Sequence, residues 1–283
     1  MSPTAAGMLL AFGAAIALNG GYLMQHVGSS GAIAIDVRRP VRTVASLLRS
    51  RLWTLGAIAG MAGWLLHLAA MREAPLSLVQ ACVAGGLVLA APMAAIGLRR
   101  PLARGETQAL VLMAVALVLL SLGLSGAVGA GATDAPALAV WTGALAAGAA
   151  VLAVRATGAH RPLALGVAAG LLYGAADMAL KAVTGLHGSA IVTSPWLAAG
   201  LVASVGAFFA FQRGLQADRP LAVIAAMTAA TNVSSILGAF VVFGDPLGPT
   251  PELAAAHGLA FALVVVAAWR LAPAQARLAG LDA

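Results

Sequence analysis

The chain has 283 residues, of which 61% are hydrophobic and 9% are charged, and its formal net charge is +7 at neutral pH. A soluble domain is about half apolar and about a quarter charged, so this composition excludes a soluble globular protein and indicates a polytopic protein of the lipid bilayer. The basic residues are scattered through loops between apolar stretches, which argues against a nucleic-acid partner. Cys82 is the single cysteine, so an internal disulfide is excluded.

Nine apolar stretches follow one another along the chain, each close to the roughly 20 residues that cross a hydrocarbon core. They predict an all-α polytopic membrane protein with nine transmembrane helices, at residues 4–26, 53–72, 76–98, 107–126, 136–154, 163–184, 196–215, 221–243 and 255–271. The first stretch lacks a basic leader and is long enough to span, so we interpret it as a membrane helix rather than a cleaved signal.

Residues 27–51 contain one aspartate and five arginines, and each would cost about 2.5 to 3.5 kcal/mol at the centre of a membrane helix. We therefore expect a cytoplasmic loop with an amphipathic helix at the membrane surface, whose apolar side is formed by Val41, Val44, Leu47 and Leu48. Over alternate loops, fourteen arginines fall on one side of the membrane and Arg72 alone on the other. This bias predicts a cytoplasmic (inner) membrane protein with its N-terminus outside and its C-terminus in the cytoplasm.

Two segments of the chain resemble each other at a constant offset of 145 residues. The recurring positions are Pro75 and Pro220, Leu76 and Leu221, Val79 and Ile224, Ala81 and Ala226, and the pairs Pro101-Leu102 and Pro246-Leu247. Because five helices separate equivalent points, the second copy is expected to cross the membrane upside down, as in many secondary transporters. The predicted organisation is a first repeat at 1–126, a linker span at 127–160 and an inverted second repeat at 161–283.

Two glycine patterns lie inside the predicted spans, Gly166-x-x-x-Gly170-x-x-x-Gly174 and Gly56-x-x-x-Gly60. Small residues at this spacing let two membrane helices approach closely. We expect both patterns to mark helix contacts rather than a functional site.

An ionisable side chain inside a membrane helix is a functional candidate, because hydrocarbon penalises it unless it has a partner or lines a wet cavity. Asp177 is the only carboxylate well inside a predicted span, with Lys181 four residues later and Tyr173 four residues before it on the same helix face. In one interpretation Asp177 is a cation or proton site and Lys181 its counter-charge. In the other the two residues form a structural pair, with Lys181 extending to the outer interface.

Other polar side chains lie inside the predicted spans. Asn19 is followed by Tyr22 and His26, and Thr228, Thr231, Asn232 and Ser235 form a stripe along one helix face. His67 and Gln212 occupy equivalent positions at the offset of 145, and Gln80 is a further candidate. We expect Asn19, His67, Gln212, Thr228 and Asn232 to line a substrate or ion pathway together with Asp177, Lys181 and Tyr173; the alternative is that they only bond neighbouring helices.

Enzyme motifs are weak in this chain. Gly123-Leu124-Ser125-Gly126 matches the G-x-S-G form found around the nucleophile of intramembrane serine proteases, but no histidine lies in a suitable glycine-rich partner helix. No H-E-x-x-H, paired intramembrane carboxylates or nucleotide-binding loop occurs. We therefore expect no enzyme activity, no metal centre, no cofactor and no coupling to ATP within the chain.

Several segments resemble the drug/metabolite transporter superfamily, of the EamA-like type, over almost the whole chain. They are Ala69-Ala70-Met71-Arg72-Glu73-Ala74-Pro75-Leu76-Ser77-Leu78-Val79-Gln80, the segment from Phe211 to Pro220, and Gly170-Leu171-Leu172-Tyr173-Gly174 leading to Lys181. The nine spans and the A-P-x-S-L-V pattern most resemble the NIPA-like magnesium transporter branch. Two departures from that branch are Trp64, where an acidic residue is typical, and Arg99-Arg100 in place of Glu-Arg.

The resemblance implies a secondary transporter that moves a small metabolite or drug-like molecule by alternating access. The alternatives are a NIPA-like magnesium or divalent cation permease and a non-transporting scaffold or subunit of a complex. Magnesium prefers carboxylate and carbonyl oxygens, and Asp177 is a single acid, so the metabolite transporter is favoured. The expected partners are a small-molecule or ion substrate and the lipid bilayer, with a homodimer as a further alternative for the assembly.

Overall fold

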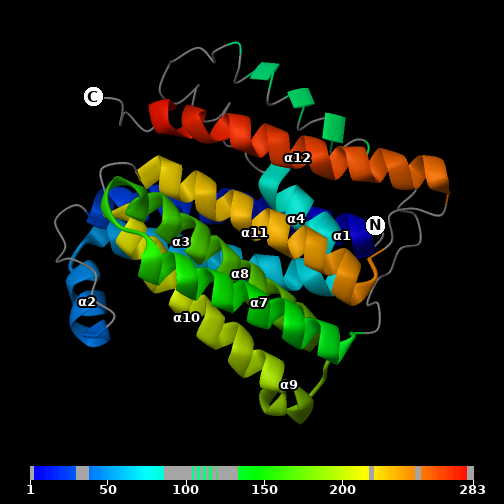
Figure 1. The fold of residues 1–283 in the computed structure, drawn as a ribbon, viewed down its shortest axis with the longest axis horizontal. Helices are drawn as coiled ribbons and strands as arrows, with labels where there is room; N and C mark the ends of the chain where they lie inside the picture. The colour runs from blue at the N-terminus through cyan, green and yellow to red at the C-terminus, as the bar shows by residue number, and fades with distance from the viewer. Residues whose placement is uncertain are drawn as a thin grey trace.

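The computed structural model describes residues 3–29, 38–85, 133–216, 220–245 and 250–278, with a few separate residues between 104 and 119. The regular structure in these ranges is entirely helical (Figure 1). Its elements are α1 (Pro3–Ser29), α2 (Pro40–Leu47), α3 (Arg51–Glu73), α4 (Leu76–Gly85), α7 (Ala135–Arg155), the 3-10 turn η1 (Gly158–His160), α8 (Arg161–Thr184), α9 (Ser189–Thr193), α10 (Pro195–Leu215), α11 (Pro220–Phe243) and α12 (Pro251–Leu278).

Within the described ranges, six helices are long and apolar enough to cross a membrane: α1, α3, α7, α8, α10 and α11. The all-helical class and the apolar, membrane-type helices are therefore confirmed. α12 contains a shorter apolar segment, Pro251–Val264, and α4 covers only the start of the predicted span 76–98. Most of span 107–126, the motif at 123–126 and the pairs Pro101-Leu102 and Pro246-Leu247 lie outside the described residues. The nine-helix count and the inverted 4+1+4 organisation stay predictions.

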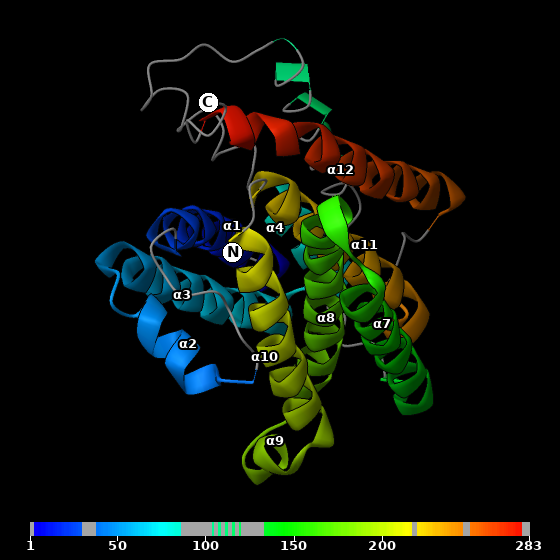
Figure 2. The same ribbon diagram turned by 60° about the vertical axis from the view of Figure 1, so that its left-hand side comes forward.

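The helices form two crossing groups around α8. α1 packs along α3, while α8 packs against α7, α10 and α11. Figure 2 shows α1 and α3 running across the direction of α7, α8 and α10, with α12 at the periphery. More than half of α8 is buried, because its alanines and glycines allow neighbours to approach from several sides.

The glycine patterns mark close helix contacts, as predicted. A Cβ added to Gly166 would lie 2.8 Å from the carbonyl oxygen of Val223 on α11, and Gly170 and Gly174 are equally confined by the same helix. Between α1 and α3, a Cβ on Gly56 would lie 2.7 Å from the carbonyl oxygen of Gly21. Real Cβ atoms essentially never come this close, so both helix pairs require glycine at these positions.

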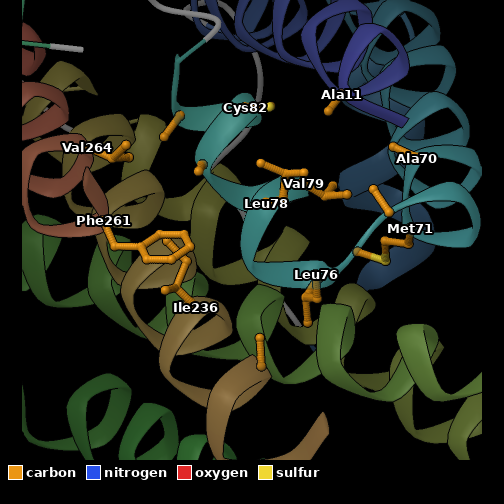
Figure 3. Packing of buried hydrophobic residues seen from close by; sticks show 14 of the residues in the cluster. Ala11, Ala70, Met71, Leu76, Leu78, Val79, Cys82, Ile236, Phe261 and Val264 are labelled. Atoms are coloured by element: carbon orange, nitrogen blue, oxygen red, sulfur yellow. The ribbon is translucent and has the colours of Figure 1, made fainter. Parts of the chain in front are cut away.

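α4 lies at the centre of the largest hydrophobic cluster. The residue before Pro75 has an extended backbone, as proline requires of its predecessor, so α3 ends at Glu73 and α4 begins directly afterwards. Figure 3 shows the buried α4 side chains, among them Leu78 and Val79, between two groups of neighbours. One group is Ala11, Ala70 and Met71 from α1 and α3; the other is Ile236, Phe261 and Val264 from α11 and α12.

The predicted surface helix forms, but it is short. α2 covers Pro40–Leu47 and packs Leu47, which is fully buried, against Trp53. Thr43, one turn earlier, is buried beside it, whereas Val41 and Leu48 stay exposed. The four apolar residues therefore do not share one environment, because α2 docks on the protein through the face of Thr43 and Leu47.

Candidate functional site

A cavity of about 510 Å³ lies among α1, α3, α4, α8, α10 and α11. This volume falls in the range of about 300 to 1,000 Å³ that is typical of small-molecule sites. Six of the eight predicted site residues line it: Asn19, His67, Tyr173, Asp177, Thr228 and Asn232. Lys181 and Gln212 are not among the lining residues.

Asp177 is the centre of a polar cluster built from four helices. Its Oδ2 accepts hydrogen bonds from Gln80 Nε2 of α4 at 2.6 Å and from Ser235 Oγ of α11 at 3.4 Å. Its Oδ1 lies 3.3 Å from His67 Nε2 of α3, and an ionised Asp177 requires the His67 proton on that nitrogen. The Asp177 side chain is 11% exposed, so these donors replace the water that burial removes.

Lys181 does not join this cluster. Its Nζ donates to the carbonyl oxygens of Met71 at 2.6 Å and Ala74 at 3.0 Å, at the carboxyl end of α3. The last carbonyls of a helix lack partners within the helix, and a lysine nearby both bonds them and matches the negative end of the dipole. The expected pairing with Asp177 is therefore replaced by a bond between α8 and α3, away from the cavity.

Gln212 lies in a second polar cluster, near the start of α3. Its Nε2 donates to Oε1 of Gln25 on α1, and its Oε1 accepts from Trp53 Nε1 at 3.2 Å. Gln25 Nε2 in turn donates to the carbonyl oxygen of Gly56 at 3.2 Å. Gln212 therefore holds Gln25 and Trp53, which do line the cavity, while it is itself fully buried behind them.

The two clusters follow one pattern. His67 of α3 contacts α8, and Gln212, its equivalent at the offset of 145, contacts α1 from α10. In both cases a basic side chain also contacts the carboxyl end of the other helix. Lys181 of α8 donates to a carbonyl at the end of α3, and His26 Nδ1 of α1 lies 3.2 Å from the carbonyl oxygen of Leu215 at the end of α10. Of the two offset-related helices, α3 is thus bound by α8 and α10 by α1.

Aromatic side chains form much of the remaining cavity wall, and sequence reasoning did not assign them to the site. They are Trp53, Trp64, Phe208 and Phe211, with Tyr22 beside them. The rings of Tyr22 and Phe211 meet edge to face at a centroid distance of 5.0 Å, and those of Trp53 and Phe208 at 6.4 Å. The sequence does not show whether an aromatic residue in a membrane helix faces lipid or a cavity. Gln25 was also not assigned to the site, although an amide inside a membrane helix is itself a reason to expect a functional or bonding role.

Replacing Gln212 with leucine should lower the free energy of unfolding by about 1 to 3 kcal/mol, because Trp53 Nε1 loses its acceptor and Gln25 its donor while both stay largely buried. Thermal unfolding of the purified protein measures this. Ser204→Ala is the matched control, since within the described part of the chain Ser204 Oγ bonds only the Gly200 carbonyl of its own helix, at 2.8 Å. Equal melting temperatures for the two variants would contradict the bridging role of Gln212.

Asp245 lies just beyond the end of α11 and binds the start of α4. Its Oδ2 accepts from the backbone N–H and from Oγ of Ser77, both at 2.8 Å. Burial raises the pKa of Asp245 above its ordinary value of 3.8, although the bonds from Ser77 and the charge of Lys181 oppose this shift. The folded protein therefore favours the protonated carboxyl more than the unfolded chain does.

This shift predicts a pH-dependent stability. The stabilisation from protonated Asp245 is fully present below the unfolded pKa and is lost as the pH rises through the higher folded pKa. Asp245→Asn should remove that loss, because the amide stays neutral and its oxygen can still accept from Ser77. Denaturant unfolding from acidic to neutral pH checks this, with exposed Glu73→Gln as the control. The same slope in Asp245→Asn and the parent would refute it.

Comparison of the chain with protein-family models, curated proteins and solved structures gave no match. The fold and the site therefore define the class of protein. Its described residues form a helical protein in which membrane-type helices surround a cavity that holds a buried carboxylate.

Proposed function

We propose that this chain is a secondary transporter of the drug/metabolite transporter type, which moves a small metabolite or drug-like molecule across the cytoplasmic membrane by alternating access. The observation that carries the proposal is the cavity around Asp177, at the meeting point of α3, α4, α8 and α11. A scaffold would be expected to pack its polar stripes against each other. Here Asn19, Asp177 and Asn232 instead border open space, from α1, α8 and α11.

The reciprocal contacts support two structurally related copies, as an inverted repeat requires. In such an arrangement, a contact from the second helix of one copy to the first helix of the other should occur twice. His67 with Asp177 and Gln212 with Gln25 are two such contacts, and they join residues far apart in the sequence. An inverted pair of copies also places the substrate path between them, where the cavity lies.

The magnesium alternative has less support from the site. Magnesium demands a near-octahedral set of oxygen ligands at about 2.0 to 2.1 Å. Asp177 is the sole carboxylate among the described lining residues, and Gln80 and Ser235 direct donor hydrogens toward it. We expect no magnesium-dependent rescue of an uptake-deficient strain, and rescue would favour the permease.

Alternating access predicts that one cavity residue is reachable from both sides of the membrane. Thr228→Cys, placed in a Cys82→Ala background, should react with a membrane-impermeant maleimide added to either face of oriented vesicles, because Thr228 lines the cavity. Ala239→Cys is the matched control, since Ala239 is fully buried in the hydrophobic cluster and should stay unlabelled. Labelling of Thr228→Cys from one face only, under all ligand conditions, would contradict the proposal.

The inverted organisation is tested separately at the chain ends. Nine spans place the two termini on opposite sides of the membrane, with the C-terminus in the cytoplasm. Reporter tags that are active in only one compartment should therefore give opposite results at the two ends. Both tags in one compartment would exclude the 4+1+4 arrangement.

A further inference from the structure

We infer that the cavity binds an amphipathic organic cation, an amine whose charged nitrogen contacts Asp177 and whose apolar body lies along the aromatic wall toward an opening between α3 and α10. This inference rests on the proposed function and names the chemical class of its substrate. Three features of the cavity carry it: its charge, its aromatic wall and the position of its opening.

The charge of the cavity favours a cation. Asp177 is the only acidic residue among the described lining residues, which include no lysine or arginine, and Lys181, one turn further along its helix, is bound to α3. Oδ1 accepts one hydrogen bond and so keeps a free acceptor position for a single N–H donor. An anionic ligand would instead meet a buried like charge.

The aromatic wall supplies the second contribution to cation binding. Tyr22, Trp53, Trp64, Tyr173 and Phe211 border the same cavity as Asp177. The face of an aromatic ring attracts a cation, and this attraction increases when water is excluded. The same rings bury the apolar part of an amine, so one wall serves both ends of an amphipathic molecule.

The opening of the cavity fits an apolar body. Met61 of α3 and Leu201 and Val205 of α10 line the cavity and are also 57%, 45% and 57% exposed, so the cavity meets the surface between these helices. The three residues lie near the middle of helices that are long enough to span, at the depth of the hydrocarbon core. An amphipathic amine dissolved in the bilayer can enter there without passing through water.

Three probes with one apolar body and different charges test the inference. They are 4-phenylbutylamine, 4-phenylbutan-1-ol and 5-phenylpentanoate, titrated onto the full chain in nanodiscs by calorimetry, with empty nanodiscs to correct for lipid partitioning. We expect the amine to bind at least about tenfold more tightly than the alcohol, a difference of about 1.4 kcal/mol, and the carboxylate to bind weakest. Equal affinity for the amine and the alcohol, or tighter binding of the carboxylate, would overturn the inference.

Substitutions locate the charged end of the probe. Asp177→Asn should reduce the preference for the amine over the alcohol to less than about threefold, whereas the exposed acid variant Glu73→Gln should keep it. Trp64→Leu should weaken amine binding about 2- to 30-fold more than Trp196→Leu, which removes a tryptophan outside the cavity. A tenfold preference that survives in Asp177→Asn would overturn the assignment. The comparison of the three probes on the parent protein needs no variant and stands if a variant fails to fold.

Transport and binding separate this inference from the proposed function. Amine binding that depends on Asp177, without counterflow of labelled amine in proteoliposomes, would reject the transporter and keep the cation site. Labelling of Thr228→Cys from both faces without amine binding would keep the transporter and reject the cation as its substrate.

Discussion

Replacing Asp177 with asparagine should reduce pH-driven uptake into proteoliposomes by about two orders of magnitude, the size expected when an essential proton-transfer group is lost. Asparagine is nearly the same size and can still accept from Gln80, so the fold should persist. It can neither carry a negative charge nor exchange a proton. The measurement is uptake of the best ligand from a thermal-shift screen, driven by an imposed pH gradient.

The control for this experiment is Glu73→Gln, which removes an exposed carboxylate at the end of α3 and should leave uptake unchanged. Asp177→Glu should keep part of the activity, because it restores the acid at a shifted position. If pH-driven uptake by Asp177→Asn equals that of the parent, Asp177 has no part in coupling, and its bonds to His67, Gln80 and Ser235 are structural.

Replacing Gly170 with leucine should destabilise the protein by more than about 3 kcal/mol, beyond the usual cost of overpacking. A Cβ at this position would overlap the carbonyl oxygen of Met227 and lie 2.6 Å from Ala230 Cβ, and neither can move without displacing α11. Because α8 and α11 both line the cavity, their separation should also abolish ligand binding. Thermal unfolding and the fraction of monodisperse protein after purification measure the effect.

Gly143→Leu is the matched control, since a Cβ on Gly143 of α7 would meet no atom of a neighbouring element within 4 Å among the described residues. It introduces the same side chain into a membrane-type helix and should leave the melting temperature nearly unchanged. If both variants melt alike, the α8–α11 contact has enough freedom to accept a larger residue, contrary to the geometry at Gly170.

Much of the helix pattern could be predicted, because hydrocarbon requires long apolar stretches. The predicted spans 4–26 and 163–184 correspond to Pro3–Ser29 and Arg161–Thr184, and spans 53–72, 136–154, 196–215 and 221–243 agree as closely. The boundaries follow from charge and proline: Arg51 and Arg161 lie where α3 and α8 begin. α9 was not predicted, since a five-residue helix leaves no clear periodic pattern.

The cavity residues were predictable only where burial is costly. Asp177, His67 and Asn232 were identified because a polar group inside a membrane helix needs a reason to be there. Their partners were not identified, because spacing along one helix reports only neighbours on that helix. Lys181 lies one turn from Asp177 in the sequence, yet the turn between α3 and α4 brings two carbonyl oxygens within its reach. Tertiary packing, rather than spacing, selects among such partners.

The hydrogen bonds of Lys181 limit how often α8 separates from the carboxyl end of α3. A hydrogen bond from a charged group contributes about 1.5 to 3 kcal/mol, so the bonds to Met71 and Ala74 together resist separation of α3 and α8 by about 3 to 6 kcal/mol unless water replaces them. An equilibrium biased to this degree leaves the separated form at roughly 0.6% to 0.004% of the population at rest. Ligand binding in the cavity would have to supply this free energy before a transported molecule could leave between α3 and α8.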